Sequence, residues 1–131
     1  MTSQPQFASA WLVSDGRVLA SADVALTSKA RRQGVIGKRG FDGAMVIPQC
    51  KWIHSIGVKV ALDVAYLNSV NAVIKVQRVK PMRIALPVAQ SRIVIEAAAG
   101  SFARWGLKLG DTVEVRDTET DVSTTAGGVL K

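Results

Sequence analysis

Leu62-Asp63-Val64-Ala65-Tyr66-Leu67-Asn68 is the stretch that decides the fold of this chain. Its side chains alternate as in a β-strand, with the even-numbered residues on one face and the odd-numbered residues on the other. Residues 69–72 then turn the chain into Val73–Val79, where Ile74 and Val76 share one face. Two β-prone runs joined by so short a turn pair antiparallel. The stretch therefore predicts a β-hairpin within a mainly antiparallel fold.

A further hairpin is expected near the N-terminus. Asp15-Gly16 lies between two β-prone runs, residues 10–13 and 18–25. A type I′ turn requires positive φ at both central positions, and Asp-Gly is a pair that adopts it readily. Additional short strands are expected at 44–47, 91–96 and 112–116.

Two short helices complete the expected elements. Thr27 or Ser28 can cap a helix over residues 29–36, because a hydroxyl there accepts from the free N–H groups of the first turn. A second helical stretch follows the strand at 91–96 and ends at Gly106, which can adopt the left-handed conformation. The expected fold class is α+β, with a mainly antiparallel, partly closed barrel-like sheet and two short helices.

Length and composition indicate one domain. The 131 residues are 48% apolar and 21% charged, which is typical of a globular chain. We expect residues 9–116 to form the domain, between a disordered N-terminus at 1–8 and a disordered acidic tail at 117–131. The apolar runs are far shorter than a membrane span and the N-terminus has no secretory signal, so a cytoplasmic location is expected.

The net charge of +7 is unevenly distributed along the chain. Residues 24–110 carry fourteen Lys and Arg against three acids, whereas residues 111–131 carry five acids against two bases. A basic body can attract nucleic acid, anionic membrane or an acidic protein. Sequence-specific nucleic-acid binding is not expected, because only 5% of the residues are aromatic and no recognition helix is indicated.

The rarer residue types cluster in the segment from Cys50 to Asp63. This segment contains the single cysteine, the single histidine and one of the three tryptophans. Two such ligands cannot complete a Cys/His zinc site, and no metal or other cofactor is expected. Cys50 and His54 would lie about 13 Å apart on a strand, so a catalytic Cys/His dyad is not expected. The stretch instead predicts a shallow ligand-binding pocket, with binding residues Trp52, His54, Gly57, Asp63 and Arg31.

Two carboxylates are expected to lie near the core. Asp63 is flanked by apolar residues, and Glu96 ends a β-rich run. A buried carboxylate is tolerated only with a cation or hydrogen-bond donors. We expect structural ion pairs with Arg31, Arg32 or Arg104, while Glu96 has the alternative of serving the N-terminus of the helix that follows.

Three interpretations of the function remain open. The favoured one is a non-catalytic binding or assembly module, in which a pocket near His54 takes a small molecule or a protein partner. The second is a small hydrolase or lyase, with His54 as general base and Asp63 orienting it, because a neighbouring carboxylate raises the basicity of a histidine. The third is electrostatic association of the basic face with nucleic acid or anionic lipid.

The order of several motifs resembles a known family. They are Arg31-Arg32-Gln33-Gly34-Val35-Ile36-Gly37, Gly43-Ala44-Met45, His54 nine residues before Asp63, Val94-Ile95-Glu96 with Ala99-Gly100, and Trp105-Gly106-Leu107-Lys108-Leu109-Gly110-Asp111. Over about residues 10–116 the chain is similar to domain-of-unknown-function family 192. In that family's central motif, a tryptophan, an asparagine and a proline stand where this chain has His54, Gly57 and Ala61. The resemblance implies a compact, mostly β domain with short helices and no established activity.

Overall fold

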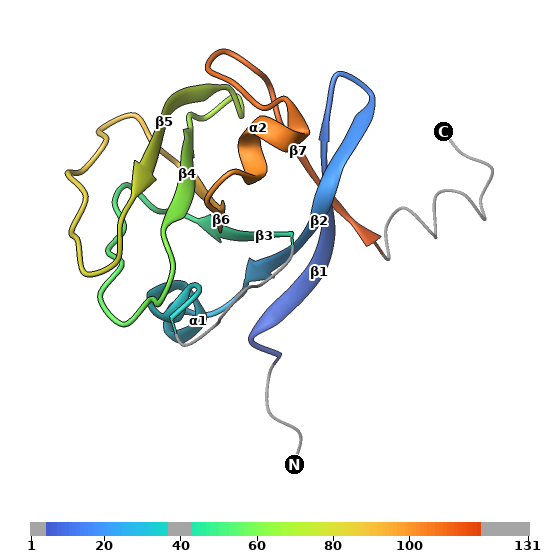
Figure 1. The fold of residues 1–131 in the computed structure, drawn as a ribbon. Helices are drawn as coiled ribbons and strands as arrows, with labels where there is room; N and C mark the ends of the chain where they lie inside the picture. Colours follow the sequence, from blue (N-terminus) through green and yellow to red (C-terminus); the bar gives the residue numbers. More distant parts are fainter. Residues whose placement is uncertain (1–4, 37–42, 119–131) are drawn as a thin grey trace.

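The computed structural model describes residues 5–36 and 43–118 of the chain. In these ranges it contains seven strands and two short helices, which Figure 1 labels. In chain order they are β1 Phe7–Ser14, β2 Arg17–Ala25, α1 Ser28–Gln33, β3 Ala44–Pro48, β4 Leu62–Leu67, β5 Val73–Val79, β6 Ile93–Ala98, α2 Ser101–Trp105 and β7 Glu114–Asp117.

All seven strands belong to one sheet, in the order β5-β4-β6-β3-β2-β1-β7. Neighbouring strands are antiparallel except β2 and β3, whose connection contains α1. The expected mainly antiparallel sheet with two short helices is therefore confirmed. The sheet is not closed into a barrel, because the edge strands β5 and β7 do not pair along their lengths; an isolated bridge between Ala72 and Thr112 links the residues just before them.

Local signals predicted the hairpins and the first helix correctly. Asp15 and Gly16 both have positive φ, at 53° and 73°, as a type I′ turn requires. Thr27 caps α1, with its hydroxyl oxygen 3.0 Å from the backbone nitrogen of Ala30. The helix ends at Gln33, earlier than the expected residue 36, because Gly34 turns to a non-helical φ of 50°.

The domain is slightly longer than expected at both ends. Phe7 and Ala8 pair with Ala25 and Val24, so β1 begins before residue 9. Asp117 pairs with Ala10 and belongs to β7. Residues 1–4 and 119–131, which include most of the proposed disordered termini, lie outside the described residues.

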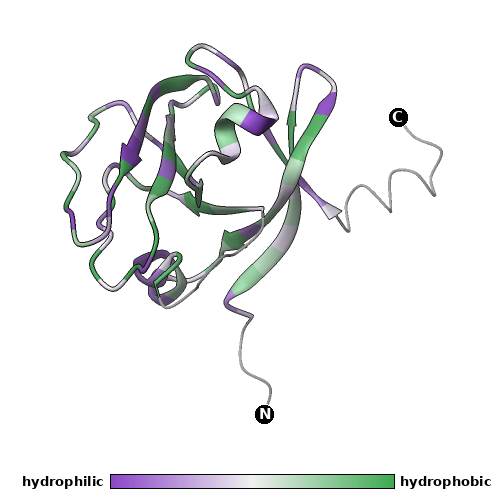
Figure 2. Ribbon diagram, viewed as in Figure 1, coloured by the Kyte–Doolittle hydropathy of each residue, from purple (hydrophilic) through white to green (hydrophobic). Residues whose placement is uncertain are grey.

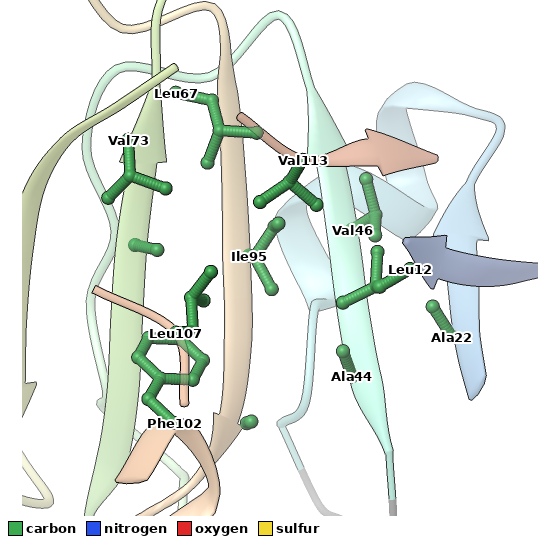
Figure 3. Close-up of a cluster of buried hydrophobic side chains, with 12 residues drawn as sticks. Leu12, Ala22, Ala44, Val46, Leu67, Val73, Ile95, Phe102, Leu107 and Val113 are labelled. Atoms are coloured by element: carbon green, nitrogen blue, oxygen red, sulfur yellow. The ribbon is translucent and has the colours of Figure 1, made fainter. Parts of the chain in front are cut away.

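The alternation in β4 divides the core into two clusters, one on each face of the sheet. On the inner face, Ala65 and Leu67 pack with Phe102 of α2, around which the sheet curves. Figure 3 shows this inner cluster, which contains side chains from β1 to β6 together with Phe102, Leu107 and Val113. On the outer face, Val64 and Tyr66 pack beneath α1 and the loops that follow β3 and β5. Both faces are buried, so β4 is the centre of the fold.

Within residues 5–36 and 43–118, no helix is long and apolar enough to cross a bilayer.

Candidate functional site

Asp63 lies on the inner face of the sheet and caps α2. Its carboxylate oxygens accept from the backbone N–H of Gly100 at 2.9 Å and of Phe102 at 3.2 Å, and from Nε of Arg78 at 3.1 Å. Gly100 is the N-cap residue of α2 and has no side chain to cap the helix, so Asp63 does so from β4.

The prediction that Asp63 pairs with Arg31, Arg32 or Arg104 was therefore wrong, because its ion-pair partner is Arg78. Arg78 stands directly opposite Asp63 in the β4–β5 register, whereas Arg31 belongs to α1 on the outer face. The His54–Asp63 pair expected for a general base does not form either, because the Asp63 carboxylate is bonded to α2 and Arg78. Asp63 also does not line the pocket that His54 lines.

A pocket of about 380 Å³ lies on the outer face, between α1, β3 and the loop that follows β3. Its size falls within the range of roughly 300–1,000 Å³ that is usual for small-molecule sites. We call it the α1 pocket; its lining residues are Ser28, Arg31, Arg32, Gln33, Gly34, Val35, Ile36, Ile47, Gln49, Cys50, Trp52, Ile53, His54, Val58 and Glu96.

The loop that carries Trp52 and His54 is held by main-chain pairing with the loop after β5. The N–H of Ser55 donates to the carbonyl of Arg83 at 2.7 Å, and the N–H of Ala85 donates to the carbonyl of Ile53 at 2.9 Å. Trp52 and His54 both line the pocket, and their rings are tilted at 45° to each other with centroids 6.0 Å apart. The Nδ1 atom of His54 is buried and has no hydrogen-bond partner among the described residues.

Glu96 forms the most unusual part of the α1 pocket. It comes from β6, is only 3% exposed, and its Oε1 atom has no hydrogen-bond partner in the described part of the chain. Burial raises the pKa of this carboxyl to about 7. Gly34 makes room for it, because a Cβ at that position would lie 3.1 Å from Oε1. The pocket therefore contains an acid that titrates near neutral pH and lacks a bonding partner.

The Gly34–Glu96 contact leads to a prediction about stability. Gly34→Ala should lower the free energy of unfolding by about 2 kcal/mol, because the new methyl group meets the carboxyl and φ is positive. Gly16→Ala is the matched control, since φ is 73° and a Cβ added there would meet no atom within 4 Å; it should cost about 1 kcal/mol. Urea denaturation measures both. Equal costs would mean that the Glu96 contact contributes nothing.

Tyr66 lies on the outer face and extends the polar environment of Glu96. Its hydroxyl is also buried without a hydrogen-bond partner among the described residues. Burial, with smaller contributions from Cys50 and Glu96, raises the pKa of Tyr66 to about 12, so the hydroxyl is neutral at physiological pH. Neutral Tyr66 therefore adds no charge that would favour ionisation of Glu96, and burial is what raises the pKa of this carboxyl.

The family model of domain-of-unknown-function family 192 (DUF192), described as "Uncharacterized ACR", matches residues 10–115. The chain belongs to this family. No curated protein matches the sequence of this family 192 member. The family assignment agrees with the resemblance found in the motifs, and it brings no known activity with it.

Two solved structures are similar to this family 192 protein. A protein of unknown function from Novosphingobium aromaticivorans DSM 12444 is 20% identical, with a TM-score of 0.68 over 82% of this chain and 84% of that chain. A protein named a "putative transcription regulator" from Sinorhizobium meliloti 1021 is also 20% identical, with a TM-score of 0.72 over 86% of this chain and 98% of that chain. At this identity the similarity shows the fold alone.

Cys50 lines the pocket of this family 192 protein without the features of a nucleophile. Its thiol donates to the carbonyl oxygen of Trp52, with Sγ 3.0 Å from that oxygen, and not to His54. Burial raises the pKa of the thiol, which disfavours the reactive thiolate. In the described ranges, no three His, Cys, Asp or Glu side chains gather as a metal-binding group.

The structure brings three of the five predicted binding residues into the α1 pocket: Arg31, Trp52 and His54. Gly57 lies just outside, where a Cβ would be 3.2 Å from Ile36, and Asp63 lies on the other face of the sheet. The sequence pattern indicated Glu96 as an ion-pair residue and did not reveal its place in the pocket. The alternation of β6 was the available signal, because Glu96 shares the face of Val94, which is the outer face.

Proposed function

We propose that this protein is a non-catalytic binding module that holds a small molecule in the α1 pocket. The observation that carries the proposal is the Glu96 carboxyl, which lines the pocket and has a buried oxygen with no hydrogen-bond partner among the described residues. Leaving such a group unsatisfied costs about 1–3 kcal/mol. A ligand that supplies a hydrogen-bond donor recovers this free energy, so the pocket favours an occupant with a donor at one end.

The remaining lining residues define the rest of the ligand. Ile36, Ile47, Ile53 and Val58 provide apolar walls, which suit a small ring or branched hydrocarbon group. Near pH 7 the Glu96 carboxyl exists in both protonation states. The neutral acid pairs with an amide edge, which both donates and accepts, and the carboxylate pairs with a cationic amine or amidine.

Catalysis and assembly receive less support than small-molecule binding. The general-base interpretation paired His54 with Asp63, whose carboxylate is committed to α2 and Arg78. Neither Nδ1 of His54 nor Oε1 of Glu96 has a hydrogen-bond partner among the described residues. The α1 pocket is a concavity of about 380 Å³, a volume within the range of roughly 300–1,000 Å³ that small-molecule sites occupy, whereas a protein interface extends over a broad surface. A ligand of a few to a dozen heavy atoms matches this size better than a protein surface does.

Three matched probes test the proposal: benzamidine, benzamide and benzoate, which share a ring and differ in the polar group. In ¹H–¹⁵N NMR spectra, benzamidine and benzamide should shift the amide signals of Gly34, Val35 and Ile53, and leave those of β7 unchanged. Benzamidine should bind roughly tenfold more tightly at pH 8 than at pH 6, because Glu96 ionises around a pKa of about 7.

Glu96→Gln is the matched variant for this experiment, because it keeps the shape of the side chain and removes the charge. It should abolish the pH dependence of benzamidine binding and leave benzamide binding within a few fold. Arg31→Ala should weaken benzoate more than benzamidine, since only benzoate carries the charge that a guanidinium attracts. The proposal is wrong if none of the probes shifts the amide signals of the pocket residues at millimolar concentration. It is also wrong if the affinity for benzamidine does not change with pH.

A further inference from the structure

We propose that a second surface of this protein docks on anionic lipid bilayers. The surface is formed by the loop after β3, residues 50–59, and the loop after β5, residues 80–92, and we call it the paired-loop surface. The exposed apolar and basic side chains on which the proposal rests, other than Trp52, do not line the α1 pocket, although the first loop also contributes Cys50, Ile53, His54 and Val58 to that pocket. The proposal is built from three observations: the pairing of the loops, their exposed apolar side chains and their uncompensated positive charge.

The two loops form a pre-organised ribbon. They run antiparallel, with the carbonyl of Lys51 accepting from the N–H of Val88 at 2.8 Å and an isolated bridge between His54 and Ile84. The buried Ser55 hydroxyl accepts from the N–H of Arg83 at 2.8 Å and donates to the carbonyl of Lys80. Main-chain groups that bond each other across the ribbon lower the cost of bringing it close to a nonpolar phase.

Large apolar side chains project from this ribbon into solvent. Met82, Ile84 and Leu86 are 62%, 67% and 78% exposed, and Trp52 and Ile56 are 47% and 45% exposed. The loop after β5 forms the left edge of the view in Figure 2, where hydrophobic and hydrophilic residues alternate. A gathering of exposed apolar side chains on one surface marks an interaction site, whereas single exposed residues do not.

The charge of the paired-loop surface selects the partner. Each loop carries lysines or arginines and no Asp or Glu, and all five basic side chains are exposed. No ion pair to any of them occurs among the described residues. They are Lys51, Lys59, Lys80, Arg83 and Arg92.

Apolar and cationic side chains on one protruding surface match the interface of an anionic bilayer. The apolar groups enter the boundary between headgroups and acyl chains, while the cations remain among the phosphates. Nucleic acid would use the cations and leave Ile84 and Leu86 in water, so it explains only half of the surface. An anionic lipid surface uses both halves, and it is the occupant that we propose.

Sedimentation of the full chain with sucrose-loaded vesicles tests the proposal. We expect binding to vesicles that contain phosphatidylglycerol, and little binding to vesicles of phosphatidylcholine alone. Ile84→Ser combined with Leu86→Ser should lower the partition coefficient by roughly tenfold or more, because each side chain loses its apolar burial. Lys80→Gln combined with Arg83→Gln should lower it by a similar factor and flatten its decrease with salt.

Val70→Ser combined with Leu109→Ser is the matched control. These side chains are 70% and 64% exposed; Val70 lies in the turn between β4 and β5, Leu109 lies before β7, and neither belongs to the paired loops. Vesicle binding should stay within about twofold of the unmodified protein. An equal loss in this control, or no sedimentation with anionic vesicles, overturns the proposal.

Two further measurements separate the outcomes. Binding to duplex DNA that is stronger than vesicle binding and unaffected by the Ile84 and Leu86 substitutions would identify nucleic acid as the partner and overturn the proposal. Glu96→Gln should leave vesicle binding unchanged, because Glu96 is buried beneath Gly34. The docking proposal and the pocket proposal can therefore fail separately.

Discussion

Asp63→Ala should lower the free energy of unfolding by about 4 kcal/mol. The substitution removes the acceptor for the N–H groups of Gly100 and Phe102 and leaves them without their partner at the start of α2. It also opens a small space in a site where Asp63 is 5% exposed. α2 carries Phe102 into the centre of the inner cluster, so loss of the cap should loosen the packing around it. Urea denaturation monitored by circular dichroism measures the change.

Arg78→Ala is the control for this prediction. It removes only the Arg78 side chain, which is 59% exposed, so solvent already screens its ion pair with Asp63. Its cost should be below about 1 kcal/mol. Asp63→Asn should fall between the two, because its amide oxygen can still accept one bond. Equal destabilisation by Asp63→Ala and Arg78→Ala would show that the ion pair, and not the cap of α2, is what Asp63 contributes.

Glu96→Gln should change the pH dependence of stability. The pKa of Glu96 is raised from 4.5 to about 7 by burial, so between these values the folded protein binds more protons than the unfolded chain. The contribution of Glu96 to the free energy of unfolding therefore falls as pH rises from about 4.5, and it levels off above pH 7. Relative to the original protein, Glu96→Gln should gain roughly 2.5 kcal/mol on going from pH 5 to pH 8.

The measurement is a series of urea denaturation curves between pH 5 and pH 8. Using the difference between the two proteins removes the contributions that they share. Glu114→Gln is the control, because a hydrogen bond from Arg116 lowers the pKa of Glu114 and the group stays ionised throughout this range. Its profile should run parallel to that of the original protein. A parallel profile for Glu96→Gln as well would mean that Glu96 is not held in its neutral form by burial.

Short-range signals predicted the local structure of this protein well. The Asp15-Gly16 turn, the cap at Thr27 and the left-handed residue at Gly106 each depend on interactions between residues a few positions apart. The alternation in β4 also predicted which side chains share a face, because successive residues of a strand point to opposite sides. Such features are encoded where they occur, so one sequence is sufficient to find them.

The two carboxylates of the core could be recognised from the sequence, but their hydrogen-bond and ion-pair partners could not. Both Asp63 and Glu96 stand in apolar runs, which correctly indicated two buried carboxylates. The backbone donors of Asp63 are the N–H groups of Gly100 and Phe102 at the start of α2, 37 and 39 residues further along the chain. Glu96 forms no ion pair among the described residues, and it lines the α1 pocket. Choosing among several arginines required the strand order, which no local pattern contains.

The amino-acid sequence by itself determined the family, the hairpins, the Thr27 cap of α1, the Gly106 end of α2 and the mainly antiparallel character of the sheet, since each of these follows from neighbouring residues or from motif order. Only the tertiary structure decided that Asp63 and His54 lie on different faces, and that His54 and Glu96 line the same pocket. The physical reason is the order of strands in the sheet. It brings β6 between β3 and β4, and so sets Glu96 beneath α1 and the loop that carries His54.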